Sequence, residues 1–316
     1  MYLFGRLAAP SRVKPEPTVH VLPADNAVLS LAPEHEPVLT IDSGDEVRIT
    51  TMDCFSNTIT DESQLFSSVG WDDVNPATGP IAVRGAQPGD TLKVEILSIE
   101  VDSVGTMTTH PDFGVLPGTV EERTRRIPVS DGLIRFSDRL SIPISPMIGV
   151  IGTAPADESV PTGTPKGHGG NMDTRRIAAG TTLYLPVAVA GANLAVGDVH
   201  AAMADGEVAV CGLEIAAVVE LRITVIPGRP LPLPFLATPE HLIAIASAPE
   251  LRDAVTESTR MMRDLLVERS ELDATDALML LSLVGDARIS QVVDPWATAR
   301  MELPVAVAEA YGITAP

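Results

Sequence analysis

The most informative stretch of the chain reads Pro165-Lys166-Gly167-His168-Gly169-Gly170-Asn171-Met172-Asp173. Between residues 165 and 214 lie eight side chains that can bind a metal or move a proton: His168, Asn171, Asp173, Asp198, His200, Asp205, Glu207 and Glu214. Glycines and short apolar runs separate them, which is typical of side chains held at strand ends and turns, because glycine permits tight turns. Oxygen and imidazole nitrogen are ligands of hard and borderline metal ions. The stretch therefore predicts a metal site built from strand ends and turns.

Length and composition indicate one large or two medium domains. The chain has 316 residues, enough to bury a sizeable core without disulfides. We expect two closely packed parts, a β-rich part over 1–165 and a β-rich core over 166–316 that carries two C-terminal helices. No apolar run reaches the roughly 18 residues of a membrane span, and the first six residues do not resemble a secretory signal. Because Cys54 and Cys211 are the only cysteines, we expect a cytoplasmic protein.

The charge balance restricts the partners. The formal net charge is −20, and lysine occurs only at 14, 93 and 166. Nucleic-acid binding requires a basic surface, so a nucleic-acid partner is not expected. A small neutral or cationic molecule suits the field of such a protein better. Acidity that only keeps the protein soluble would explain the same charge.

Alternation of apolar and polar residues predicts a mainly β protein. We expect strands over 46–52, 81–83, 92–96, 182–189 and 219–225. Pro186 would put its strand at a sheet edge or at a bulge. Residues 103–140 look loop-rich, with short strands at 113–116 and 132–136, and residues 142–152 look like a long apolar loop.

The pattern changes after the proline-rich connector at 227–239. Apolar residues recur every three or four positions over 251–266, which predicts a helix, and Ser247 with Glu250 could form its capping box. Asp273 is expected to cap a second helix over 276–284 that ends at Gly285. Strands are predicted again at 288–293 and 303–307. The predicted class is therefore mainly β (α+β), with sandwich or barrel sheets and a short helical pair near the C-terminus.

Sequence motifs distinguish between several types of catalytic site. The sequence contains no Gly-x-Ser-x-Gly elbow, P-loop or Gly-x-Gly-x-x-Gly motif. A Cys–Glu–Lys amidase site could be imagined from Cys54, Glu207 or Glu214, and Lys166, although nothing in the spacing supports it. A metal that activates water needs about three protein ligands and an open position. The candidates for these ligands are Asp53, which ends the first clear strand, and Asn171, Asp173, Asp198, His200, Glu207 and Glu214. Cys54 as a small buried apolar residue, and Asp198 and Asp205 as ordinary turn residues beside glycines, remain alternative interpretations.

A series of short motifs, in order from about residue 40 to 300, resembles the acetamidase/formamidase family. The motifs are Asp53-Cys54, Thr78-Gly79-Pro80, Gly85-Ala86 with Pro88-Gly89-Asp90, Gly169-Gly170-Asn171-Met172-Asp173, Leu185-Pro186-Val187, Gly191-Ala192, Gly197-Asp198-Val199-His200-Ala201, Asp205-Gly206-Glu207-Val208, Gly212-Leu213-Glu214 and Ile289-Ser290-Gln291-Val292-Val293-Asp294. Departures are Ala204, where the family usually has glycine, and Val210-Cys211-Gly212-Leu213-Glu214, where the family has Gly-x-Gly-Ile-Glu. Residues 103–140 match poorly. The departures leave the preference between formamide and acetamide open.

The resemblance implies hydrolysis of short aliphatic primary amides to a carboxylate and ammonia, on a β-rich fold that self-associates as a homodimer or higher homo-oligomer. It also implies a divalent metal, zinc or calcium. The interpretation that follows gives the metal to Asp53, Asp173, His200 and Glu214, and makes Glu207 the general base and then the acid. Asn171 and the amides of Gly169 and Gly170 would hold the oxyanion. Further pocket candidates are Cys54, His168 and Asp198. The partner is a small neutral amide, with neither nucleic acid nor membrane. The alternatives are a Cys54-dependent amidase and a non-catalytic small-ligand-binding protein of the same fold.

Overall fold

The computed structural model describes residues 17–70 and 73–316, which form 21 strands and three α-helices. The N-terminal residues considered for a secretory signal lie outside the described residues. None of the described helices combines the length and the apolar composition needed to cross a membrane.

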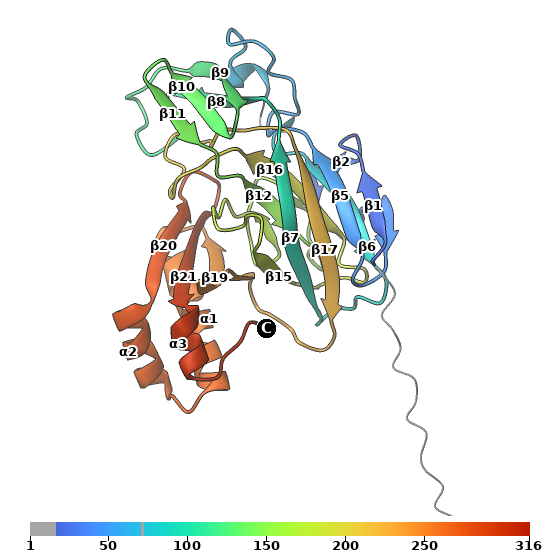
Figure 1. Cartoon of the computed structure of the whole chain (residues 1–316), viewed down its shortest axis with the longest axis vertical. Coiled ribbons are helices and arrows are strands. Elements are labelled where there is room, and N and C mark those ends of the chain that lie inside the picture. Colours follow the sequence, from blue (N-terminus) through green and yellow to red (C-terminus); the bar gives the residue numbers. More distant parts are fainter. Residues whose placement is uncertain (1–16, 71–72) are drawn as a thin grey trace, which may run out of the picture.

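Most strands belong to two large sheets (Figure 1). The nine-stranded sheet contains, from edge to edge, β1 (Val19–Leu22), β5 (Glu46–Thr51), β17 (Ala217–Ile226), β7 (Thr91–Val101), β15 (Thr182–Pro186), β18 (Phe235–Ala237), β19 (His241–Ala248), β21 (Ala297–Pro304) and β20 (Asp286–Gln291). The six-stranded sheet contains β14 (Gly169–Asn171), β12 (Met147–Gly152), β16 (Leu194–His200), β6 (Ala77–Val83) and β2 (Ala27–Val28), with β4 (Leu39–Ile41) also paired to β6. Each sheet has two free ends, so neither closes into a barrel.

Two smaller sheets complete the β structure. A four-stranded sheet contains β11 (Leu140–Pro143), β10 (Leu133–Ser137), β9 (Arg123–Ser130) and β8 (Val104–Thr109), and β13 (Val160–Pro161) pairs with β3 (Ser30–Leu31). The helices are α1 (Leu251–Arg269), α2 (Ala274–Val284) and α3 (Val305–Ala310), with a 3-10 turn at Phe66–Ser68. In Figure 1 the four-stranded sheet lies at one end of the molecule, and the helices lie at the other end beside β19, β20 and β21.

The main core fills the space between the two large sheets. Along β17 the residues Ala217, Val219, Leu221 and Ile223 are buried and alternate with partly exposed ones, as the sequence predicted. These side chains belong to the same apolar cluster as residues of the six-stranded sheet, among them Ile81. A second cluster joins α1, α2 and α3 to β19 and β21. The chain is therefore a β-sandwich with a helical layer at one end, and strands from 1–165 and from 166–316 share both large sheets.

The predicted helices are present, and only one of their caps differs. The Asp273 carboxylate accepts from the N–H groups of Thr275 and Asp276, and α2 ends at Gly285 as expected. The capping box is wrong, because Ser247 belongs to β19 and Glu250 stands at the N-cap of α1 without a side-chain hydrogen bond.

Five predictions about strands and loops need correction. Residues 113–116 form no strand, whereas 147–152, expected as loop, form the buried strand β12. The segment 103–140 carries most of a sheet. β15 is an interior strand, because it pairs with β7 on one side and β18 on the other. Pro186 is tolerated because it is the last residue of the strand and lies beyond the residues paired with β18. Residues 305–307, expected as strand, begin α3, because Val and Ala fit either structure.

A buried arginine connects the C-terminal strands to a turn near the main sheets. Arg300 of β21 is 1% exposed. Its Nε donates to Glu302 at 2.7 Å, Nη2 donates to Asp205 at 2.7 Å, and Nη1 donates to the carbonyl of Ile289 at 2.8 Å. Arg176 donates to Glu302 from the other side at 3.2 Å. Because each of these charges has a hydrogen-bonded partner of opposite sign, the desolvation cost of burying the network is largely offset.

We expect Arg300→Met to lower the free energy of unfolding by about 3–5 kcal/mol, because Asp205 would lose its partner and the buried Glu302 would keep only Arg176. Arg288→Met is the matched control. Arg288 pairs with Asp286 on the exposed face of neighbouring β20, so its loss should cost about 1 kcal/mol or less. Urea denaturation of both variants measures the difference, and equal costs would contradict the structural role of Arg300.

Candidate active site

Strands β14 and β16, which flank β12 in the six-stranded sheet, supply the centre of the candidate site. Asp198 and His200 lie two residues apart on β16, and Asn171 ends β14 on the other side of β12. Asp173 follows two residues after Asn171. Glu214 forms an isolated antiparallel bridge with His200, which fixes it beside β16. The sheet therefore brings together residues that the sequence spreads over more than forty positions.

His200 is surrounded by acidic side chains. Its Nε2 lies 3.1 Å from an oxygen of Glu214, 3.5 Å from Asp198 and 3.7 Å from Asp173. All four residues are at most 3% exposed. Several buried polar atoms here make no hydrogen bond of good geometry, although Nε2 of His200 lies close to Oε2 of Glu214: Oδ1 of Asn171, both carboxylate oxygens of Asp173, both ring nitrogens of His200 and Oε2 of Glu214. Buried polar groups usually have partners, so these atoms mark a place prepared for a bound group.

Two glycines make room for these side chains. A Cβ on Gly149 of β12 would stand 2.4 Å from Oδ1 of Asp173 and 2.5 Å from Oδ2 of Asp198. A Cβ on Gly212 would stand 2.6 Å from Nδ1 of His200. Real Cβ atoms do not approach other atoms so closely, so only glycine fits at these two positions.

The backbone of the site adopts unusual conformations. Asp173, Asp198 and Glu207 have φ angles of 40°, 53° and 49°, and Val210 has a φ of 85°. Residues other than glycine rarely adopt positive φ, at a cost of about 1–3 kcal/mol each. Such conformations gather where the rest of the structure holds side chains in a required direction.

Burial and mutual repulsion shift the titration of these groups. Burial raises the pKa of Asp173 well above its usual range, and the carboxylates of Glu207 and Asp198 raise it further. Burial similarly raises the pKa of Glu207, and that of Glu214 to about 8. Burial alone would lower the pKa of His200, but Glu214 and Asp198 outweigh it and raise the pKa. The site therefore favours the uptake of a proton or of another positive charge.

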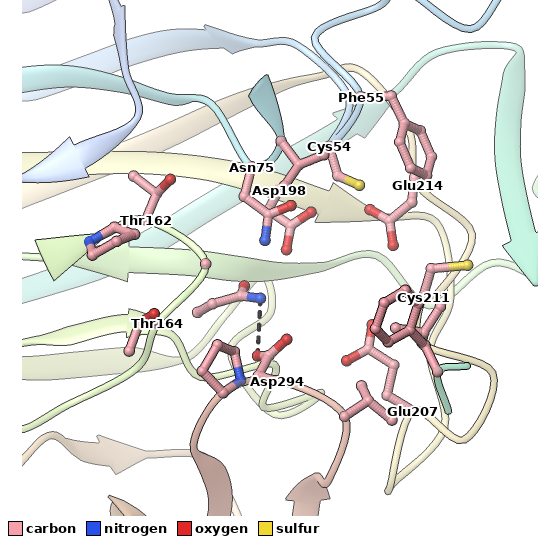
Figure 2. Close-up of a pocket in the computed structure, with 18 of the residues that line it drawn as sticks. Cys54, Phe55, Asn75, Thr162, Thr164, Asp198, Glu207, Cys211, Glu214 and Asp294 are labelled. Carbon is pink, nitrogen blue, oxygen red and sulfur yellow. Dashed lines mark hydrogen bonds between the residues drawn. The ribbon is translucent and has the colours of Figure 1, made fainter. Parts of the chain in front are cut away.

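A cavity of about 650 Å³ opens beside these groups (Figure 2). The carboxylates of Asp198, Glu207, Glu214 and Asp294 point toward a common space, with Thr162 and Thr164 across from Phe55. Asn171 also lines the cavity and donates through Nδ2 to Asp294 at 3.0 Å.

The other predicted residues lie around this centre in different roles. Asp53 is buried, and its Oδ1 accepts from the N–H groups of Phe55 and Asn57 at 3.1 and 2.7 Å, so it holds the turn after β5. Cys54 lines the cavity. His168 is buried, and burial lowers its pKa to about 4. Gly169 and Gly170 both have positive φ and pack closely on the carbonyls of Ile151 and Thr164.

The two aspartates that were interpreted as turn residues differ. Asp205 does lie in a turn, where it receives the hydrogen bond from Arg300. Asp198 lies inside β16, and its carboxylate reaches the centre of the site. The adjacent Gly197 suggested a turn, but it is needed in the strand because a Cβ there would stand 2.1 Å from the carbonyl oxygen of Pro76.

Two ionisable residues that line the cavity were not among the candidates from the sequence. Asp294 lies just after β20, and burial raises its pKa, helped by Asp173 and Asp198. Its signal was available, since it ends a quoted motif and directly follows a predicted strand. Cys211 also lines the cavity. Its thiol accepts a hydrogen bond from the backbone N–H of Thr108 and donates one to the carbonyl oxygen of Thr108, which holds the thiol in place. Nothing in the spacing of Cys211 distinguished it from a core residue.

The arrangement combines an open cavity, buried carboxylates of raised pKa and an imidazole. It is the kind of site in which water is activated and protons are transferred. The fold and site thus define a hydrolase-type centre on an open β-sandwich.

Comparison with known proteins identifies the family. Residues 30–162 and 156–310 match the acetamidase/formamidase family, so the chain belongs to this family of amide-cleaving hydrolases. The resemblance found in the sequence motifs is confirmed.

The chain is similar to several named relatives. A formamidase of Methylophilus methylotrophus is 26% identical over 254 residues, which are 61% of this chain and 62% of that protein. The match thus spans less than two thirds of the length of this curated relative. The crystal structure of an acetamidase from Bacillus halodurans is 45% identical, with a TM-score of 0.91 over 93% of this chain and 100% of the other. A predicted acetamidase/formamidase from Thermoanaerobacter tengcongensis is 44% identical, with a TM-score of 0.92 over 94% and 99%.

We expect Gly149→Ala to lower the free energy of unfolding by about 1–3 kcal/mol, because the new methyl group would push against two buried carboxylates. Gly167→Ala is the control, since its Cβ would meet its nearest neighbours at 3.6 and 3.7 Å, ordinary contact distances. Urea denaturation compares the two variants. A Gly149→Ala protein as stable as the control would contradict the close packing described for Asp173 and Asp198.

Proposed function

We propose that this protein hydrolyses primary amides of the formamide and acetamide type to a carboxylate and ammonia, with the help of a bound divalent cation. Membership of the acetamidase/formamidase family supports the reaction class. The observation that carries the proposal is the group of buried carboxylates around His200, in which both oxygens of Asp173 and Oε2 of Glu214 make no hydrogen bond of good geometry. Burying several carboxylates without compensating charge is costly, and a cation would remove that cost.

The donor atoms fit a metal ion. Two groups of side chains each offer three ligand atoms within 4.8 Å of one another: Asp173, His200 and Glu207, and Cys54, Asp198 and Glu214. Carboxylates suit both zinc and calcium, whereas the imidazole of His200 favours zinc. We therefore propose zinc ahead of calcium, held by Asp173, His200 and Glu214, which leaves Glu207 to act on water and substrate. Asp53 would support the ligands from the turn after β5, since its Oδ1 is engaged by backbone N–H groups.

A divalent cation bound here would lower the pKa of a water molecule and polarise the amide carbonyl. Glu207 is the proposed general base, because its carboxylate points into the cavity and burial raises its pKa, which strengthens it as a base. The water oxygen forms the new bond to the carbonyl carbon as Glu207 takes a proton. The C–N bond then breaks, and Glu207 returns the proton to the departing ammonia. Asn171, with the Gly169 and Gly170 amides nearby, is the proposed oxyanion partner.

The Cys54-dependent alternative has less support. Burial raises the pKa of the Cys54 thiol well above its usual range, helped by Glu214 and Asp198. A thiol is a nucleophile only as the thiolate, so such a group is poorly activated. Lys166, its imagined partner, forms an ion pair with Glu158 at 2.6 Å and lies over the ring of Trp296.

We also propose a cytoplasmic homo-oligomer that meets neither nucleic acid nor membrane. Both cysteines are free and buried, which suits a reducing compartment. Leu278, Met279 and Leu283 on α2 are 50%, 60% and 82% exposed, an apolar surface that self-association would cover.

The reaction is tested by measuring ammonia release from formamide and acetamide before and after chelation, with metal content determined by mass spectrometry. We expect release from both amides, loss of at least about 99% of the activity on complete metal removal, and recovery with zinc. Cys54→Ala should keep metal-dependent turnover. Absence of ammonia from any primary amide would refute the reaction, and full activity without metal would refute the role of the cation.

Asp173→Asn tests the cation site without an activity assay. In chelated protein the variant should be more stable, because the buried native carboxylate faces other carboxylates without compensating charge and asparagine carries no charge. Asparagine tolerates the positive φ of this position. With zinc present the order should reverse, because the wild type gains more from the bound ion. Asp157→Asn, at an exposed position, should change neither value. Unfolding curves that do not respond to zinc in either protein would contradict the site.

A further inference from the structure

The cavity beside the buried carboxylates is much larger than formamide or acetamide. Its volume is about 650 Å³. Acetamide has roughly four non-hydrogen atoms, and at about 30 Å³ for each water-sized group it would fill on the order of 120 Å³. Cavities of several hundred Å³ with mainly apolar walls are typical of sites that enclose larger small molecules. An amide confined to the carboxylates would leave most of the space to water.

One wall of this cavity is made of aromatic side chains. Phe55 and Phe66 meet edge to face with ring centroids 6.0 Å apart, and Phe66 meets His110 at 6.3 Å. Phe113 continues the series, 4.6 Å from His110. Phe55, Phe66 and Phe113 line the cavity, and Val74 packs beside them. Aromatic rings favour flat or branched apolar groups placed against them at these spacings.

This wall lies within reach of the reacting group. Phe55 is adjacent in sequence to Cys54, and Figure 2 shows its ring beside Glu214, with Thr162 and Thr164 across the space. An amide whose carbonyl faces the carboxylates could therefore direct its acyl group along the aromatic wall.

The charge of the lining restricts the acyl group further. Four carboxylates face the cavity, and among the described lining residues none is Lys, Arg or His. A carboxylate on the acyl group of the substrate would meet only side chains of like charge. Apart from the four carboxylates, most of the cavity wall is apolar. The substituent that suits this lining is uncharged and apolar.

We propose that the acyl group recognised by this cavity is an uncharged apolar group about the size of phenylacetyl, carried on a primary amide. The inference rests on the proposed amide hydrolysis and specifies its substrate class. Phenylacetamide has about ten non-hydrogen atoms, on the order of 300 Å³ on the same scale, and fits within the available volume.

The test measures steady-state kcat/KM of the metal-loaded full chain for acetamide, butyramide, phenylacetamide and succinamate. Ammonia release is the readout. The ring of phenylacetamide is separated from the carbonyl by a methylene, so its intrinsic reactivity stays close to that of acetamide. We expect kcat/KM to rise at least about tenfold from acetamide to phenylacetamide, since even one buried methylene is worth about tenfold or more. Succinamate, matched in length to butyramide, should fall at least about tenfold below it.

Val74→Trp, which narrows the cavity beside the aromatic wall, should lower the ratio of kcat/KM for phenylacetamide to that for acetamide by at least about fivefold. Val267→Trp on α1 lies outside the cavity and should leave the ratio unchanged. An unchanged ratio in a folded Val74→Trp protein would overturn the proposal.

The outcomes separate this inference from the reaction itself. Ammonia from acetamide with kcat/KM falling toward phenylacetamide would overturn the acyl preference and leave amide hydrolysis standing. Release from none of the amides would refute the reaction. In that case, calorimetry of phenylacetamide and acetamide binding would test which acyl group the cavity recognises. Phenylacetamide binding at least about tenfold more tightly than acetamide supports the acyl preference, and equal or absent binding overturns it.

Discussion

Four buried carboxylates share one space with a single imidazole, and this concentration of negative charge is the constraint on which the rest of the site depends. Asp173, Asp198, Glu207 and Glu214 are each at most 6% exposed. Repulsion and burial together raise the pKa values of Asp173, Glu207 and Glu214. Only a rigid frame can hold such groups together, and the strands on both sides of β12 provide it.

The protein contains a second group of buried charges, and the contrast is informative. Around Arg300 each charged group has a hydrogen-bonded partner of opposite sign. Arg300 pairs with Glu302 and Asp205, and Arg176 pairs with Glu302. That network needs nothing from outside and serves the architecture, because Asp205 stands two residues before Glu207. Around His200 the carboxylates greatly outnumber the cations. The difference separates a group that supports the fold from a group that receives a ligand.

Local sequence signals predicted the elements whose side chains alternate between core and solvent. The strand β17 and the helices α1 and α2 are of this kind. β12 was mistaken for a loop because it is buried on all sides, carries Gly149 and Gly152, and follows Pro146, so no alternation marks it. Asp173, His200, Glu207 and Glu214 were identified together because they recur in short motifs of the family. Asp294 and the aromatic wall were not, because only the folded sheets bring residues 55–113 and 294 to residue 198.

The positive φ angles at residues 173, 198 and 207 have a consequence for evolution and for engineering. At such positions glycine relieves backbone strain, most of all at Glu207, because aspartate adopts the left-handed region more readily than glutamate. A selection for thermal resistance that ignored turnover would therefore favour replacement of these residues, and each gain in robustness would remove part of the site. Ancestral or consensus reconstruction of this chain should for that reason be constrained at these three positions, whatever is allowed to vary elsewhere.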